Sequence, residues 1–265
     1  MTEELVAAVR RRTDEVVAAL QALDDDALQA ASALPGWSRL TIACHLRYGA
    51  EAFGRMTAAA LEDHAVAYYP GGRAARRPAT LEPAAGEGPA DVVASLAEHG
   101  QVLDGLWTGL SEDRWDLVVR EPDDAPDLGP LPLNRLPLLR LTEVEVHGTD
   151  LDLGLPDWSD VFVRVALPFR LGWLNARRTN HRSVDAAVTG SWLLTAPDGP
   201  TWRVAVDGGT VRSEPAGRKA PADAVVEAPA RDLLALLLGR PLRAEPRYGG
   251  DVALARAFSR AFPGP

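Results

Sequence analysis

The most constraining feature of the sequence is a series of four long segments within the first 155 residues in which apolar residues recur every three or four positions. These segments lie at about residues 2–22, 39–61, 90–110 and 134–154. In the first, Leu5, Val9, Val16 and Leu20 share one face, with arginine and glutamate residues opposite. That spacing is typical of amphipathic helices. Four of them in succession predict an antiparallel four-helix bundle.

The second half of the sequence has a different pattern. A helix is expected at about residues 158–177, and after it apolar and polar residues alternate between short turns. This alternation predicts strands at 191–195, 201–206, 210–213 and 224–227, followed by helices at 230–238 and 252–262. We therefore predict an α+β fold with a bundle over residues 1–156 and a small α+β domain over residues 157–265.

Two residues are expected to begin helices. Ser38 precedes the second helical segment and Asn134 precedes the fourth, and both residue types are favoured as N-caps. The connections at 70–89 and 121–132 are longer than most connections in bundles, so we expect them to be functional or mobile.

Charge limits the class of partner. The chain of 265 residues has a formal net charge of −9 and a pI near 5.1. Nucleic-acid binding is therefore not expected, because no basic stripe is available to neutralise phosphates. Arginines cluster at 10–12 and 73–77. We interpret the first cluster as a solvated helix face and the second as a candidate anion-binding loop.

Cysteine content and hydropathy indicate the compartment. A single cysteine excludes an internal disulfide and predicts a reducing environment. We interpret this residue, Cys44, as part of the core rather than as a nucleophile. The first ten residues lack the apolar region of a secretion signal, and no apolar run is long enough to span a membrane. We expect a cytoplasmic monomer or homodimer that acts on small molecules.

Potential metal ligands lie in the second and fourth helical segments. Glu143 and His147 are four residues apart and share one face of a helix, with Asp150 near the same side. His45 stands on the apolar face of the second segment. Two imidazole nitrogens and one carboxylate oxygen from His45, Glu143 and His147 would leave a zinc coordination position open, as in catalytic sites.

Each of these residues also has an interpretation without metal. His45 could be a core histidine, and Asp150 could cap the C-terminus of its helix. Glu143 and His147 could be a surface pair worth about 0.2–0.5 kcal/mol. Apolar residues surround the pair, however, and indicate a partly buried face, where a carboxylate without a cation is costly.

Several motifs, taken in order along nearly the whole chain, resemble the mycothiol-dependent maleylpyruvate isomerase family. In the first half they are Leu34-Pro-Gly-Trp-Ser38, Cys44-His-Leu46, Tyr68-Tyr-Pro-Gly-Gly72, and Arg140-Leu-Thr-Glu-Val-Glu-Val-His147 with Asp150-Leu151. In the second half they are Ala228-Pro-Ala-Arg-Asp-Leu-Leu234 and Leu238-Gly-Arg240.

The resemblance implies a DinB-like bundle over residues 1–156 and a sterol-carrier-like domain over residues 157–265. It also implies a zinc ion held by His45, Glu143 and His147, with mycothiol as the thiol cosubstrate. Many relatives have a second histidine directly after the last metal ligand, where this chain has Gly148. The pocket wall is therefore expected to differ, while the ligand set is retained.

An isomerase mechanism follows from the resemblance. Zinc would favour the thiolate form of mycothiol, which would add to the cis double bond of an unsaturated dicarboxylate and leave after rotation about the resulting single bond. The expected catalytic residues are His45, Glu143, His147 and Asp150, with Asp150 orienting an imidazole. The candidates for binding the substrate carboxylates are Arg73, Arg76, Arg77 and Arg240.

Three other functions are compatible with the sequence. In a mycothiol S-transferase, the same thiolate would displace a leaving group from an activated carbon. In a zinc hydrolase, Asp150 or Glu145 would act as the base, although we expect Glu145 to lie on a solvated face. The chain could also bind a metal or a hydrophobic ligand without catalysis.

Overall fold

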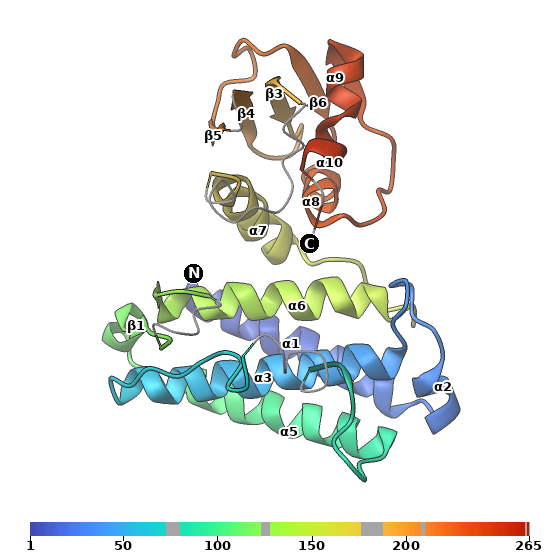
Figure 1. Ribbon diagram of the computed structural model, residues 1–265, viewed down its shortest axis with the longest axis vertical. Helices are drawn as coiled ribbons and strands as arrows, with labels where there is room; N and C mark the ends of the chain where they lie inside the picture. The colour runs from blue at the N-terminus through green and yellow to red at the C-terminus, as the bar shows by residue number, and fades with distance from the viewer. Residues whose placement is uncertain (73–79, 123–127, 176–187, 208–209, 263, 265) are drawn as a thin grey trace. The chain divides into compact units, whose positions relative to one another are not determined.

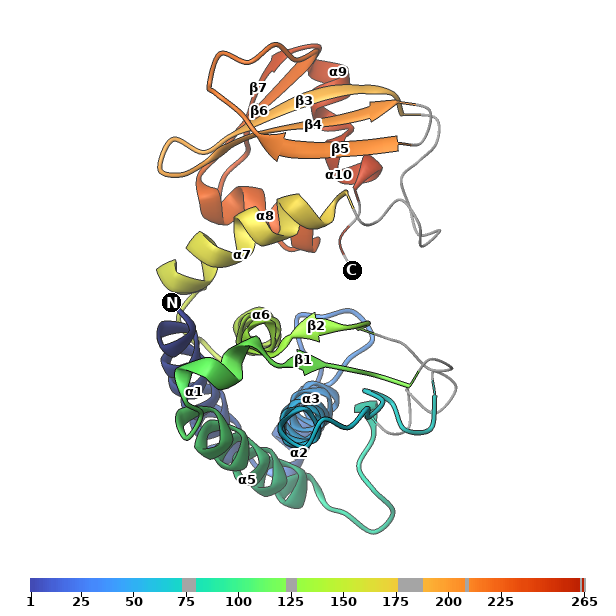
Figure 2. The ribbon, with the colours of Figure 1, turned by 90° about the vertical axis from the view of Figure 1, so that its left-hand side faces the viewer.

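The chain folds into two compact units, Met1–Phe162 and Val163–Pro265. The computed structural model describes residues 1–72, 80–122, 128–175, 188–207, 210–262 and 264. Figures 1 and 2 show long helices in the first unit and a sheet in the second. The prediction of an α+β fold, with a helical region followed by a small sheet-containing domain, is therefore confirmed. The division falls at residue 162, whereas the sequence placed it at residue 156.

Four long helices form the first unit, and α1 and α3 each pack against both α5 and α6. Their bounds are α1 (Thr2–Gln21), α3 (Arg39–Leu61), α5 (Pro89–Thr108) and α6 (Leu136–Asp150). Their inward faces carry aliphatic side chains that are almost completely buried, such as Leu20, Ile42, Leu96 and Leu141. Burial of each such side chain contributes about 1.5–3 kcal/mol, so packing holds the four helices together.

Neighbouring helices of the bundle are not all antiparallel. Arg39, at the start of α3, donates from Nε to the Leu151 carbonyl beyond the end of α6 at 3.1 Å, so these helices are antiparallel. Trp107, near the end of α5, donates from Nε1 to Thr57 Oγ1 near the end of α3 at 3.0 Å, so this pair is parallel. The long connection between α3 and α5 makes the parallel pair possible, because it returns the chain to the end of the bundle where α3 began.

One of the two predicted caps is present. The Ser38 hydroxyl accepts a hydrogen bond from the Thr41 amide at 3.0 Å and so begins α3 as predicted. The prediction for Asn134 is wrong, because a 3₁₀ turn (Leu133–Arg135) precedes α6. The Asn134 side-chain amide instead donates to Asp116 at 3.3 Å and is engaged outside the helix.

Short elements that the sequence did not predict complete the first unit. The helix α2 follows α1, and a two-stranded antiparallel ribbon precedes α6 (Figure 2). Their bounds are α2 (Asp25–Gln29), a 3₁₀ helix (Glu112–Asp116), β1 (Val118–Val119) and β2 (Leu131–Pro132). They are too short to show a hydrophobic period in the sequence.

The second unit is built on a five-stranded sheet with the order β5-β4-β3-β6-β7. Among the strands that the structure describes, the β3–β6 pair alone is parallel, and the predicted β3-β4-β5 meander is present. The strand bounds are β3 (Gly190–Thr195), β4 (Thr201–Asp207), β5 (Thr210–Pro215), β6 (Ala224–Glu227) and β7 (Arg247–Gly250). β7 was not predicted, because its sequence contains two glycines and no alternation.

Helices precede, interrupt and follow the strands of this sheet along the chain. Their bounds are α7 (Asp160–Trp173), which begins in the first unit, α8 (Ala230–Leu238), α9 (Val252–Arg256) and α10 (Phe258–Ala261). α8 has the predicted bounds, whereas the predicted closing helix is interrupted at Ala257. Trp192 of β3 packs edge to face against Phe258 and Phe262 at 5.9 and 5.8 Å, so the two short helices close an aromatic core.

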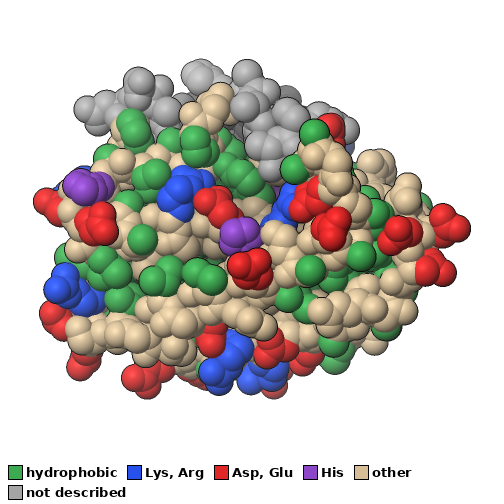
Figure 3. Space-filling model, turned by 90° about the horizontal axis from the view of Figure 1, so that it is seen from below, with side chains coloured by type: hydrophobic (Ala, Val, Ile, Leu, Met, Phe, Trp, Pro, Cys, Tyr) green, Lys and Arg blue, Asp and Glu red, His purple; other side chains and the backbone are tan. Residues whose placement is uncertain are grey.

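Charged side chains of both signs lie on the described surface. On the face shown in Figure 3, acidic and basic side chains are interspersed. Within the part of the chain that the structure describes, no helix combines the length and the apolar character needed to cross a membrane.

Candidate metal centre

The antiparallel packing of α3 and α6 brings His45 opposite Glu143 and His147. His45 Nε2 lies 2.7 Å from Glu143 Oε2, and His147 Nε2 lies 3.5 Å from the same oxygen. One potential ligand atom of each residue lies within 4.8 Å of those of the other two. Residues 98 positions apart in the chain are therefore neighbours in one cluster.

The electrostatics of the cluster keep its carboxylate charged. Burial opposes the ionisation of Glu143, but hydrogen bonds from His147 and His45 outweigh it and hold its pKa well below the ordinary value. Burial also opposes charge on His147, but Asp150 and Glu143 raise its pKa to about 9. An ionised oxygen beside two imidazole nitrogens is a donor set that suits zinc, which would replace the protons between them.

Two side chains hold the His147 ring in place. Its Nδ1 lies 2.9 Å from Asp150 Oδ2, which directs Nε2 toward Glu143. The Trp37 ring stacks on the His147 ring with centroids 5.8 Å apart and meets the His45 ring edge to face at 5.5 Å. The sequence did not mark Trp37 as a site residue. Its only signal was its place in a motif just before α3.

The comparisons with known proteins identify the family. The family described as the mycothiol maleylpyruvate isomerase N-terminal domain matches residues 9–152. The chain belongs to this family. The resemblance inferred from the sequence motifs is therefore confirmed.

Two similar solved structures are described as the mycothiol-dependent maleylpyruvate isomerase and a histidine-to-alanine mutant of it. Each shares 18% sequence identity with this chain at a TM-score of 0.69, and the match covers 94% of this chain and 93% of that chain. At this level of identity, the likeness shows a common fold. Among curated proteins, no sequence matches this chain significantly.

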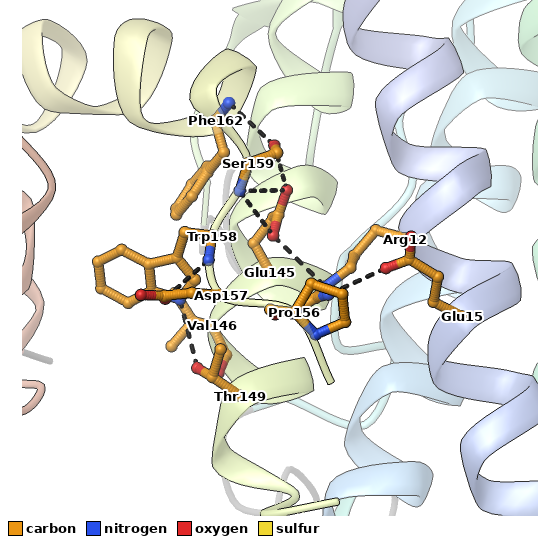
Figure 4. Close-up of polar contacts among 10 residues, drawn as sticks. All are labelled: Arg12, Glu15, Glu145, Val146, Thr149, Pro156, Asp157, Trp158, Ser159 and Phe162. Atoms are coloured by element: carbon orange, nitrogen blue, oxygen red, sulfur yellow. Dashed lines mark hydrogen bonds and ion pairs between the residues drawn. The ribbon is translucent and has the colours of Figure 1, made fainter. Parts of the chain in front are cut away.

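In this member of the maleylpyruvate isomerase family, Glu145 belongs to a separate network (Figure 4). It is buried, lies 3.4 Å from Arg12 Nε and accepts a hydrogen bond from the Ser159 hydroxyl. Arg12 also donates to the Pro156 carbonyl at 2.8 Å. The expectation that Glu145 and Arg12 are solvated is wrong, because α1 and α6 pack together at this point. Glu145 is committed to this network and not to the histidine cluster.

Cys44 precedes His45 on α3 but does not share its surroundings. Its side chain is fully buried, and burial raises the pKa of the thiol to about 11. The interpretation of Cys44 as a core residue is therefore confirmed. A thiol that stays protonated at neutral pH is a poor nucleophile.

The described residues do not test the roles of the four arginines predicted to bind substrate. Arg73, Arg76 and Arg77 lie outside the described residues. Arg240 follows α8 in the second unit, where its Nη1 donates to the Leu238 carbonyl at 3.0 Å. Their roles stay predictions.

A different arginine, Arg140, does lie on the α3–α6 interface. Its Nη1 donates to the Leu46 carbonyl of α3 at 2.7 Å, and its side chain is fully buried. Sequence reasoning included Arg140 only as part of a motif. Its position three residues before Glu143 was the signal that could have singled it out, because that spacing places both residues on one face of α6.

Proposed function

We propose that this protein is a zinc enzyme that uses mycothiol to isomerise a cis-unsaturated dicarboxylate. The observation that carries the proposal is the convergence of His45, Glu143 and His147 within the region that matches the family. The names of the two similar structures supply the choice of mycothiol and of an isomerisation. By the family resemblance, we also propose that the second unit is a sterol-carrier-like domain.

The residues of the cluster have distinct roles in this proposal. His45, Glu143 and His147 would hold the metal ion, which when bound would stabilise a thiolate over a thiol. Asp150 would keep the His147 proton on Nδ1, so that Nε2 stays available as a ligand. Trp37 would restrict both imidazole rings and shield one side of the cluster from water.

The reacting thiol would come from the cosubstrate, because Cys44 is buried and protonated. The mycothiol thiolate would add to one carbon of the double bond, which leaves a single bond about which the substrate can rotate. Expulsion of the thiolate would restore the double bond in the trans form. The thiol is regenerated, so the reaction needs no oxidant or reductant.

The test is the isomerisation of maleylpyruvate by the zinc-loaded protein with and without mycothiol, followed by proton NMR. We expect trans product only when both zinc and mycothiol are present. His147→Ala should lose zinc and more than about 100-fold in activity, because loss of even an outer partner of a metal ligand costs about 10- to 100-fold. His64→Ala is the matched control, since His64 is exposed near the end of α3.

Two results would contradict the proposal. Full zinc occupancy in folded His147→Ala would exclude the ligand set. Formation of a mycothiol adduct with an activated electrophile, with no isomerisation of any cis-dicarboxylate, would favour the S-transferase.

A further inference from the structure

Arg140 has a buried guanidinium that lacks partners on one edge. The residue is 1% exposed, and the only hydrogen bond that its guanidinium makes to the described residues is from Nη1 to the Leu46 carbonyl. Its Nε and Nη2 are buried and have no hydrogen-bond partner. No carboxylate of the described residues forms an ion pair with it. Burial lowers its pKa to about 10, so it remains charged at neutral pH.

The two free nitrogens have a geometry that selects a ligand. Nε and Nη2 lie on the same side of the planar guanidinium, and their N–H bonds point in one direction. This edge is the one that binds a carboxylate through two parallel hydrogen bonds. A buried cation whose donors are unpaired is costly, and such a group in a native structure calls for an explanation such as a missing ion or ligand.

The position of Arg140 relates this edge to the candidate metal centre. Arg140, Glu143 and His147 follow one another at helical spacing on the face of α6 that meets α3. Arg140 precedes Glu143 by three residues, or about 4.5 Å along the helix axis. The guanidinium and the ligand cluster therefore belong to neighbouring turns of the same face of α6. The acceptor of its Nη1, Leu46, is the residue after His45.

A glycine on α3 makes room for this arrangement. A Cβ atom placed on Gly49 would lie 3.2 Å from Arg140 Nη1 and 3.6 Å from the Tyr68 hydroxyl. Gly49 is one helical turn after His45, so along α3 a potential metal ligand is followed by a gap. Glu143 and Arg140 lie on the face of α6 that meets α3. Tyr68, whose hydroxyl lies at the same gap, is also buried.

We propose that Arg140 binds a carboxylate of the substrate next to the metal centre and thereby selects anionic substrates. This inference rests on the proposed function for the identity of the substrate. Arg140 belongs to the first unit, as the three potential metal ligands do. The second carboxylate of the substrate would be bound by other groups.

The experiment measures binding of maleate, a simple cis-unsaturated dicarboxylate, to the metal-free protein by calorimetry. We expect Arg140→Lys to weaken binding about ten-fold, because lysine retains the charge but loses the paired donors, and Arg140→Met to weaken it further. Gly49→Ala should also weaken binding, because it displaces the guanidinium without changing its charge. Arg135→Lys, at an exposed position just before α6, is the matched control and should bind normally.

A measurement on the unmodified protein covers the case in which the variants fail to fold. Maleate should shift one arginine Nε–H signal in the nitrogen–proton NMR spectrum, assigned to Arg140 through its proximity to Leu46. No shift of that signal, or equal maleate affinity in folded Arg140→Lys, would overturn the assignment.

The outcomes separate this inference from the proposed function. Maleate binding that depends on Arg140, with no mycothiol-dependent isomerisation by the enzyme, would support the role of Arg140 and contradict the proposed function. Mycothiol-dependent turnover with an unchanged KM for the dicarboxylate in Arg140→Lys would support the proposed function and overturn the role of Arg140.

Discussion

At the scale of single residues, Gly148 follows the candidate ligand His147 but faces α1 and not the candidate metal centre. A Cβ atom there would lie 3.0 Å from Arg12 Nε and 3.2 Å from Val16 Cγ2. Position 148 therefore faces α1, and its lack of a side chain lets α1 and α6 approach closely. A histidine at this position, as expected in many relatives, would displace Arg12 from its ion pair with Glu145.

Asp150 offers a test of how the ring of a ligand is held. We expect Asp150→Asn to keep the fold and a hydrogen bond to His147 but to weaken zinc binding by about ten-fold or more, because the charged partner of the ring is lost. Competition with a coloured chelator would measure the affinity.

The control for this change is Asp152→Asn. Asp152 is exposed and has a φ of 54°, a left-handed conformation that asparagine tolerates, so stability and zinc affinity should not change. Unchanged zinc affinity in Asp150→Asn would leave Asp150 with a purely structural role.

The site was predictable where one helix carries the pattern. Glu143 and His147 share a face of α6 by spacing alone, and His45 stood out as a polar residue on an apolar face. Arg140 and Trp37 were not singled out, because arginine and tryptophan on helices or in turns usually serve packing. Their roles depend on the crossing of α3 over α6, which a single sequence does not encode in any local period.

At the scale of elements, the long connection before α5 is fastened to α3 by one ion pair. Arg47 Nη1 lies 2.5 Å from Glu87 Oε1, and both side chains are mostly buried. The other Glu87 oxygen accepts a hydrogen bond from the Ala84 amide at 2.8 Å. The hydrogen bond from Arg47 lowers the pKa of Glu87 and outweighs the opposing effect of burial.

We expect Glu87→Gln to lower the free energy of unfolding by about 1 kcal/mol at pH 7. Because the folded pKa is depressed, this stabilisation is fully present above the unfolded value of about 4.5 and is lost as the pH falls through the folded pKa. Urea unfolding of both proteins at pH 7 and at several values below 4.5 would measure the difference, which should vanish at low pH.

Glu62→Gln provides the comparison, since the only ion pair of Glu62 among the described residues is an exposed one with His64 at 3.4 Å. It should change stability little at any pH. A stability loss in Glu87→Gln that stays constant with pH would show that Glu87 contributes through packing and not through its charge.

The elements themselves were largely predictable where they are long or strongly patterned. The four bundle helices, α8 and β6 follow from periodicity, because packing on one face repeats along the whole segment. The β1–β2 ribbon and β7 are too short or too rich in glycine to show a period. The directions of the helices were also not predictable, because they depend on where the long connection between α3 and α5 leads.

At the scale of the whole molecule, the candidate metal centre and Arg140 belong to one of two compact units. The three potential ligands, Asp150, Trp37 and Arg140 all precede residue 163. Each unit has a buried core of its own, that of the second unit being formed around Trp192. Units with separate cores are expected to open separately in native-state fluctuations.

Zinc binding should therefore stabilise one unit and not the other. A ligand bound only by the native state stabilises it by about 2.7 kcal/mol at 100 times its Kd, so zinc should slow amide hydrogen exchange in α3 and α6. The strands β3, β4 and β6 should exchange at unchanged rates, since no candidate ligand cluster lies among the described residues of their unit. Mass spectrometry of exchanged peptides, with His147→Ala as the control, would measure both. If zinc slowed amide exchange in the sheet as much as in α3 and α6, the two units would open as one. The prediction that zinc stabilises only the bundle would then be wrong.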